Sequence, residues 1–168
     1  METFLFVLNI VGYASTVLVI ITALWGIVLW YRGIAPVLLR LGKGLATRRI
    51  AILAGGDEQT SLKSLLVDSG VFRKKNIISV VKFGDIGRAE KATLYVIHWP
   101  SWGNSLDKVL AQKSDTTGLV VYAPHEDGQL SDAVMAKLNQ QRNVTVANFR
   151  GRLLSDILLS MMTTSCAQ

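Results

Sequence analysis

Residues that could bind a ligand follow five short apolar runs of the chain, at the points where the strands of a sheet would end. They are glycines, charged residues, aromatic rings and an amide: Gly55, Gly56, Asp57, Lys82, His98, Trp99, Trp102, Asn148, Phe149, Arg150 and Arg152. Arg150 and Arg152 stand at the start of a predicted helix, where cations oppose the helix dipole, so their placement favours an anionic partner. Trp99 and Trp102 flank a Pro-Ser pair in a predicted loop, and exposed tryptophan can stack on a nucleic-acid base. We therefore predict a site for a nucleotide or a short oligonucleotide.

Some of these residues also have a purely structural explanation. The sequence AGGDEQTS around Gly55 and Gly56 lacks the spacing of the common glycine-rich phosphate loops, and a tight turn from strand to helix accounts for the pair. Packing beneath the domain, or against a neighbouring subunit, would account equally well for Trp99 and Trp102.

Enzyme signatures are mostly absent. No serine lies in a G-x-S-x-G elbow, and one cysteine with two distant histidines cannot build a usual zinc site. A phosphoacceptor receiver domain needs an aspartate after the third strand and a lysine after the fifth, where this chain has His98 and Asn148. We predict no catalytic residue, no metal and no cofactor. The alternative is a membrane-tethered NAD hydrolase of the TIR type, with Glu58, Glu90 or Glu126 in its cleft.

Short apolar runs alternate with helical patterns from residue 49 onward. Runs of Ile, Val, Leu and Ala without polar alternation suit a parallel sheet that is buried on both faces. The predicted strands are 50–54, 77–81, 93–97, 119–123 and 144–147, and the predicted helices are 60–67, 86–91, 105–112, 132–140 and 152–162. This pattern predicts an α/β fold, with a doubly wound, mostly parallel five-stranded sheet of flavodoxin or TIR type in the order 2-1-3-4-5.

The first 32 residues predict a transmembrane helix. No charged residue lies between Glu2 and Arg32, and at about 1.5 Å per residue this stretch exceeds the roughly 30 Å of a hydrocarbon layer. Trp25, Trp30 and Tyr31 at its end are typical of the membrane interface. Its length and its acidic start distinguish it from a signal peptide.

One face of this predicted helix carries small and polar residues. They recur at helical spacing: Asn9, Gly12, Thr16, Ala23 and Gly26. Lipid does not reward burial of such groups, so the face is typical of packing against another helix, which predicts a homo-oligomer. Asn9 and Thr16 would then pair between helices or line a wet path. A lone anchor with scattered small residues is the alternative.

Positive charge is concentrated directly after the predicted membrane helix. Residues 32–49 hold five basic side chains and no acid, out of a formal net charge of +6 for the whole chain. Basic residues beside a membrane segment stay on the cytoplasmic side, so we expect the N-terminus outside and the C-terminal domain in the cytoplasm. Cys166 has no second cysteine to pair with, which agrees with a reducing compartment.

The chain between the membrane helix and the sheet has a pattern of its own. Val37, Leu38, Leu41 and Leu45 repeat at helical spacing among basic residues, and Pro36 suits a first helical turn. We expect a short amphipathic helix on the membrane surface, or else a plain linker. The predicted divisions are residues 1–32 for the membrane helix, 33–48 for this segment and 49–168 for the α/β domain.

Three segments resemble a family of antiviral membrane effectors. WYRGIAPVLLRLGKGLATRRIAIL, GDIGRAEKATLYVIHW and NVTVANFRGRLLSDILLSMMTTS are similar to the small membrane effectors encoded beside a nucleotidyltransferase in Hailong-type defence. The resemblance implies an oligomeric ion channel of the bacterial inner membrane. It further implies that an oligodeoxyadenylate made by the nucleotidyltransferase holds the channel closed, and that loss of this ligand during infection opens it.

Overall fold

The computed structural model describes residues 2–125 and 129–164. The chain divides into two compact units, Met1–Gly42 and Lys43–Gln168. Glu126 and Cys166, which the sequence singled out, lie outside the described residues.

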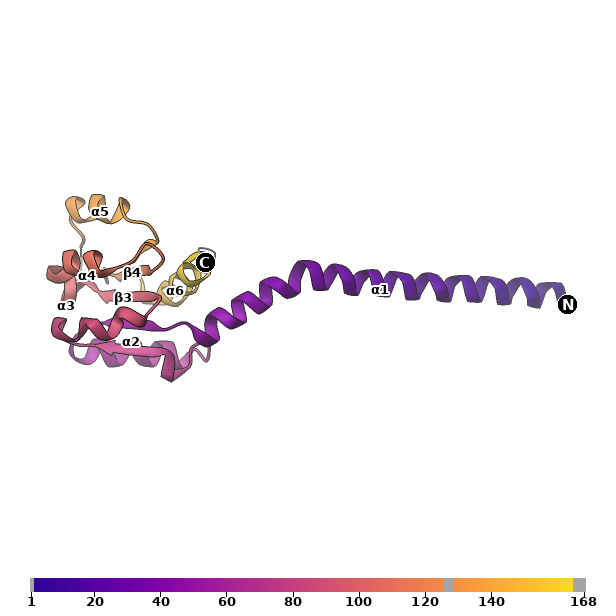
Figure 1. Ribbon diagram of the computed structural model, residues 1–168, viewed down its shortest axis with the longest axis horizontal. Coiled ribbons are helices and arrows are strands. Elements are labelled where there is room, and N and C mark those ends of the chain that lie inside the picture. Colours follow the sequence, from indigo (N-terminus) through magenta and orange to yellow (C-terminus); the bar gives the residue numbers. More distant parts are fainter. Residues whose placement is uncertain (1, 126–128, 165–168) are drawn as a thin grey trace. The chain divides into compact units, whose positions relative to one another are not determined.

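The described part of the first unit, residues 2–42, is helical and belongs to one long helix that continues into the second unit. Helix α1 (Glu2–Thr47) contains the apolar stretch Asn9–Leu38, which is long and apolar enough to cross a membrane (Figure 1). The most apolar part of this stretch contains no residue that is buried within the protein. The predicted N-terminal apolar helix is therefore confirmed.

The expected separate amphipathic helix after residue 32 is not seen, because α1 continues without a break to Thr47. Pro36 lies in the interior of α1, where its missing N–H removes one backbone hydrogen bond, rather than in the first turn of a new helix. The side chains of Arg40, Leu41 and Leu45 lie outside the described part of the structure.

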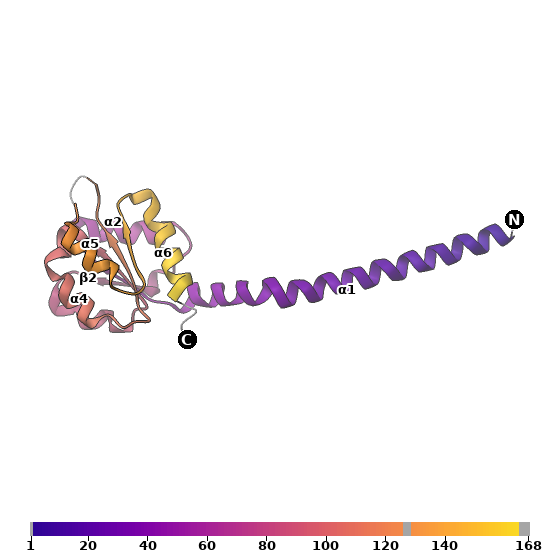
Figure 2. The ribbon, with the colours of Figure 1, turned by 90° about the horizontal axis from the view of Figure 1, so that it is seen from above.

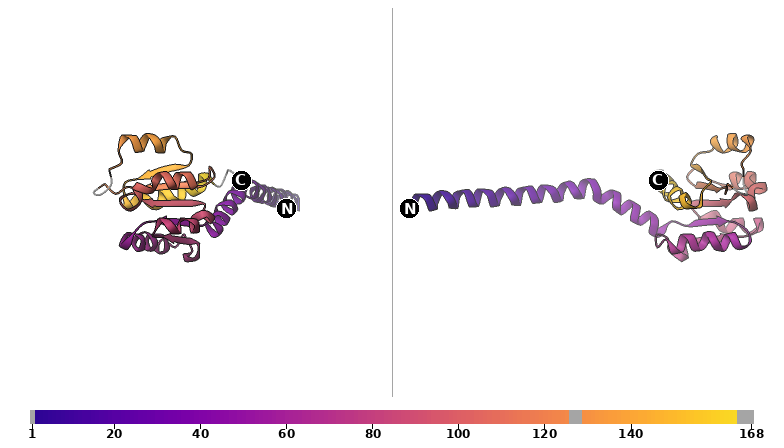
Figure 3. Two further views of the ribbon diagram at one scale, coloured as in Figure 1. Left: turned by 60° about the vertical axis from the view of Figure 1, so that its left-hand side comes forward. Right: turned by 180° about the vertical axis from the view of Figure 1, so that it is seen from behind.

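The second unit is built on a parallel sheet, as the sequence predicted. Its strands are β1 (Ile50–Leu53), β2 (Ile77–Val80), β3 (Leu94–His98), β4 (Gly118–Tyr122) and β5 (Val144–Ala147). They pair in the order β2-β1-β3-β4-β5, and every pairing is parallel. Figure 3 shows the two margins of the domain, with the magenta segments around β2 at one and the orange α5 at the other.

Helices connect the strands and cover both faces of the sheet. They are α2 (Gly56–Asp68), α3 (Trp99–Trp102), α4 (Leu106–Gln112), α5 (Asp132–Asn139) and α6 (Arg150–Thr164), with 3-10 segments η1 (Lys74–Asn76), η2 (Phe83–Lys91) and η3 (Gly103–Ser105). The expected helix at 86–91 is the longer 3-10 segment η2, which contains two glycines that weaken a regular α-helix.

Two apolar cores lie on the two faces of the sheet. One contains Ile52, Val96 and Val120 from the strands, together with residues of α2 and α6. The other contains the alternate strand residues, together with residues of η2, α4 and α5. Figure 2 shows α4 and α5 on one side of the strands and α6 on the other. Burial on both faces is the reason that the strands read as continuous apolar runs.

Candidate functional site

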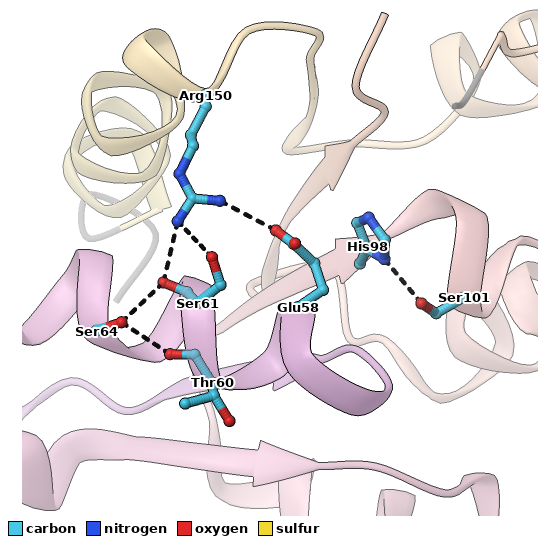
Figure 4. A network of polar contacts seen from close by, with 7 residues as sticks. All are labelled: Glu58, Thr60, Ser61, Ser64, His98, Ser101 and Arg150. Carbon is cyan, nitrogen blue, oxygen red and sulfur yellow. Dashed lines mark hydrogen bonds and ion pairs between the residues drawn. The ribbon is translucent and has the colours of Figure 1, made fainter. Parts of the chain in front are cut away.

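Arg150 joins two helices at the carboxyl edge of the sheet. It is the first residue of α6, and its Nη1 lies 3.2 Å from Oε1 of Glu58 in the first turn of α2. Its Nη2 donates to Oγ of Ser61 at 2.6 Å and to the Ser61 carbonyl at 3.2 Å (Figure 4). The N-termini of two helices therefore meet around one guanidinium group.

The turn between β1 and α2 brings Glu58 to this position. Gly55 is the N-cap of α2 in an extended conformation, and Gly56 has φ +58°, a conformation that favours glycine. The side chain of Glu58 is 29% exposed and that of Arg150 is 44% exposed. The pair is therefore accessible to a solute.

His98, the last residue of β3, and Ser101 form a second polar contact at this edge of the sheet. Nδ1 of His98 lies 2.8 Å from Oγ of Ser101 (Figure 4). The His98 ring lies 5.8 Å from the ring of Tyr122, the last residue of β4. Ser101 lies beside Gly55, because a Cβ built on that glycine would be 3.8 Å from the Ser101 hydroxyl. We call the residues Glu58, Ser61, His98, Ser101, Tyr122 and Arg150 the Arg150 cluster.

Tyr122 lies close enough to Glu58 and Arg150 for both charges to act on its hydroxyl. Burial and, to a smaller extent, the nearby Glu58 raise the pKa of the Tyr122 hydroxyl above its ordinary value of 10.0. The charge of Arg150 and its hydrogen bond to the hydroxyl act in the opposite direction. Tyr122 is therefore neutral at physiological pH and presents a hydrogen-bonding hydroxyl to Arg150.

The Arg150 cluster lies at the topological switch point of the sheet. Strands β1 and β3 are neighbours, and the chain leaves β1 toward β2 on one side and β3 toward β4 on the other. In open α/β sheets, ligands bind in the crevice at the carboxyl ends of such strands. The location fits the predicted ligand edge.

A separate hollow of about 470 Å³ lies beside the carboxyl ends of β4 and β5. It is lined by Ala123, His125, Gln129, Leu130, Met135, Val146 and Asn148. Val146 packs with the core on the α4 and α5 side of the sheet, so the hollow opens on that side. Of the predicted ligand residues, Asn148 lines it, two positions before Arg150.

Trp99 and Trp102 do not form an exposed stacking platform, which was one of the two equal alternatives from the sequence. They lie in α3 rather than in a loop, and Trp102 is 4% exposed. Trp102 packs in the core with its ring 6.4 Å from that of Phe83, and Trp99 is partly buried against the same core. Pro100 lies in the first turn of the short helix, a position that suits proline because no backbone N–H is needed there. The packing alternative is the correct one for Trp102.

Other predicted residues lie outside the Arg150 cluster. Lys82 precedes η2 beside the edge strand β2, and Asp57 and Phe149 are exposed. Arg152 is exposed and lies 3.8 Å from Asp156 of its own helix. Of the predicted set, the structure brings Gly55, His98 and Arg150 together.

The glutamates that would serve a hydrolase differ in position. Glu58 is paired with Arg150. Glu90 lies at the end of η2 near the start of β3, where its charge acts on Tyr95, so it is at the opposite edge of the sheet. Within residues 2–125 and 129–164, no group of three or more His, Cys, Asp or Glu side chains could hold a metal ion.

The small and polar face of α1 is uncovered in the single chain. Its members Asn9, Gly12, Thr16, Ala23 and Gly26 are all exposed. Thr16 donates its hydroxyl to the Gly12 carbonyl at 2.8 Å, so it has a partner within its own helix. No hydrogen bond of the Asn9 amide occurs among the described side chains of α1.

Ser61, Ser101 and Tyr122 belong to the Arg150 cluster but were absent from the predicted set. Ser61 lies in the second turn of α2, and only the fold brings it under Arg150. Tyr122 is the last residue of an apolar strand, so the sequence pattern indicates a residue of the buried core. A polar tip at the end of a buried strand is the signal that could have indicated it.

Comparison of the chain with protein-family models, with curated proteins and with solved structures finds no match in any of the three. The geometry of the Arg150 cluster and the character of α1 therefore carry the functional argument.

Proposed function

We propose that this chain is a membrane effector whose α/β domain binds a nucleotide-type anion at the Arg150 cluster and thereby controls ion flow through a homo-oligomer of α1 helices. The resemblance to Hailong-type effectors makes an oligodeoxyadenylate, supplied by a partner nucleotidyltransferase, the first ligand to test. We place the oligomer in the bacterial inner membrane, with the domain in the cytoplasm, and assign it to antiviral defence.

The observation that carries the binding proposal is the half-exposed Arg150 guanidinium at the meeting point of two helix N-termini. Helix N-termini favour anions, and arginine recognises the oxygens of phosphate as it does those of carboxylate. Glu58 supplies a carboxylate at this place in the free protein. A ligand phosphate would therefore replace Glu58 as the partner of Arg150.

The same ion pair makes the alternative, a TIR-like NAD hydrolase, less favourable. A catalytic carboxylate must reach the reacting atoms of the substrate, whereas the Glu58 carboxylate is directed to Arg150. Incubation of the detergent-solubilised protein with NAD tests this alternative. Release of nicotinamide that is lost in Glu58→Gln would support the hydrolase instead.

Binding of a labelled short oligodeoxyadenylate to the full-length protein tests the proposal. We expect Arg150→Ala to raise the Kd about ten-fold to a hundred-fold, because charge-assisted hydrogen bonds are lost. We expect Glu58→Gln to lower the Kd up to about five-fold, because a competing anion is removed.

Lys82→Ala is the matched control for the loss of one positive charge. Lys82 is exposed and lies beside β2, so its removal should change the Kd less than about two-fold. Equal effects of Arg150→Ala and Lys82→Ala would remove Arg150 from the site. Failure of the unaltered protein to bind any oligodeoxyadenylate or mononucleotide would overturn the binding proposal.

A further inference from the structure

Helix α6 carries Arg150 at its first residue, and its last turn contacts Arg48, which belongs to the same unit of the chain and directly follows α1. Arg48 is the first residue after α1, and its Nη1 donates to the Met161 carbonyl and to Oγ1 of Thr164, each at 2.8 Å. The last carbonyls of a helix lack partners within the helix, and a cation there complements the helix dipole. Arg48 therefore caps the C-terminus of α6.

α6 is a continuous element between these two contacts. It has 15 residues, which at about 1.5 Å per residue gives roughly 22 Å. Leu153, Ile157 and Met161 are buried along its inner face against the sheet. A displacement of one end of a packed helix is passed to the other end, because close-packed interfaces do not deform continuously.

The packing of α6 on the sheet includes one interaction that costs free energy. Asp156 is buried in the middle of the helix, and its Oδ2 has no hydrogen-bond partner within the part of the chain that the structure describes. Its Oδ1 lies 3.8 Å from the exposed Arg152, which is a weak pairing. An incompletely paired buried carboxylate destabilises the packed arrangement of α6, which lowers the free energy needed to displace the helix on the sheet.

We propose that α6 couples the Arg150 cluster to the membrane helix, and that Arg48 is the positioning residue through which this coupling reaches α1. Loss or gain of a partner at Arg150 shifts α6 on the sheet, and the shift moves the segment that follows α1. As a gating mechanism this rests on the proposed function. The coupling between Arg150 and Arg48 can be measured without any ligand.

Hydrogen exchange of the full-length protein in detergent provides the ligand-free test. We expect Arg150→Ala to raise the exchange rates of amides in residues 43–49 about five-fold or more. In protein that already carries Arg48→Ala, Arg150→Ala should add less than about two-fold, because the connection is broken. Unchanged exchange at 43–49 in Arg150→Ala, or an equal increase in both backgrounds, would overturn the coupling.

Arg49→Ala is the matched control, because Arg49 carries the same charge at the next position and its side chain is exposed. In that background the effect of Arg150→Ala should be retained. Arg48→Lys should restore part of the coupling, since an ammonium group can donate to the same acceptors. Thr164→Val removes one acceptor of Arg48 and should give an intermediate effect, which guards against general unfolding of Arg48→Ala.

A second arm adds the short oligodeoxyadenylate used above. The unaltered protein should show altered exchange at residues 43–49 on binding, whereas Arg48→Ala should bind without transmitting the change. A full response at 43–49 in Arg48→Ala would contradict the role of Arg48. Absence of binding by the unaltered protein would refute the proposed ligand, while the ligand-free arm still decides the coupling.

Discussion

At the scale of single residues, the Arg150 cluster is held by an ion pair weak enough for the proposed anionic ligand to replace it. The ion pair between Arg150 and Glu58 is partly exposed, and exposed pairs stabilise proteins by only about 0.2–1 kcal/mol. Ser61 and Tyr122 orient the guanidinium from its other sides. The arginine is thus preoriented, while its anionic partner costs little to exchange.

Gly56 sets the direction in which α2 leaves the sheet. Its φ of +58° lies in the left-handed region, so Gly56→Ala should destabilise the protein by about 1–2 kcal/mol even though no atom lies within 4 Å of the new Cβ. Denaturant unfolding of the full-length protein in detergent measures the effect. Gly87→Ala is the control: it also meets open space, with no positive φ, and should change stability by less than about 0.5 kcal/mol. Equal losses in the two variants would contradict the role of backbone strain.

Tyr122 gives the domain a specific dependence on alkaline pH. Its pKa in the folded protein lies above 10.0, so as pH rises past that value the unfolded chain releases the proton first and the free energy of unfolding falls. Tyr122→Phe removes this dependence. At neutral pH the variant should be less stable by about 0.5–1.5 kcal/mol, because the hydrogen bond to Arg150 is lost.

The stability difference between Tyr122→Phe and the unaltered protein should therefore shrink as pH rises above 10.0. Thermal unfolding at a series of pH values measures it. Tyr95, whose pKa is also raised by burial, and Lys113, whose pKa is lowered by burial, are present in both proteins and cancel in the comparison. A constant difference across the pH series would contradict this account.

At the scale of elements, the contact between α6 and the start of β4 depends on a missing side chain. A Cβ on Gly118 would lie 2.7 Å from Cδ1 of Leu94 and 3.3 Å from Cγ2 of Thr164. Leu94 is fully buried and has little room to move. Gly118→Ala should therefore destabilise the protein by about 1–3 kcal/mol and loosen the end of α6.

Gly151→Ala is the comparison within the same helix. Gly151 lies in the first turn of α6 with open space around its Cα, so alanine should be neutral or stabilise the helix by up to about 1 kcal/mol. Thermal unfolding and hydrogen exchange of α6 measure both variants. A loss of stability in Gly151→Ala similar to that in Gly118→Ala would show that the close approach is not the cause.

At the scale of the whole molecule, α1 leaves much apolar surface without a partner in the single chain. Large apolar side chains from Phe6 to Leu38 are exposed around it, which a lipid environment would cover. Lipid would not satisfy the side chain of Asn9, which lies on the face with the small residues. An amide at membrane depth needs a hydrogen-bond partner or water.

Asn9→Leu should reduce ion flux through liposomes that contain the protein, because it removes the polar group from the face proposed to line or shape the pore. Fluorescence of an ion-sensitive dye measures the flux. Ile21→Leu is the control, since residue 21 lies about half a turn away from that face. Intact flux in Asn9→Leu, with equal incorporation into the liposomes, would argue against this face.

The membrane-length helix and the strands of the sheet could be predicted, because each depends on local composition. An uncharged apolar stretch longer than a hydrocarbon layer needs no partner to indicate a membrane-length helix. Apolar runs such as Val120 and its neighbours indicate buried parallel strands, since both faces of each strand must be covered. The strand order followed from the alternation of strands and helices, which allows few right-handed arrangements.

The membership of the Arg150 cluster could be predicted only in part. Strand ends indicated Gly55, His98 and Arg150, because the carboxyl ends of parallel strands share an edge. Two further features could not be predicted: that Ser61 and Tyr122 lie beside Arg150, and that Trp102 is buried. Both depend on which helix covers which face of the sheet. The cap that Arg48 places on α6 joins positions more than a hundred residues apart, which no local pattern records.

The sequence by itself therefore determined the membrane-length helix, the parallel sheet and the edge of the sheet that collects Gly55, His98 and Arg150, since these follow from hydrophobic periodicity and chain reach. Tertiary structure alone decided that Glu58 pairs with Arg150 and that α6 lies between Arg150 and Arg48. The reason is that such contacts arise from the packing of whole elements, whose relative positions are set by the shared cores on the two faces of the sheet.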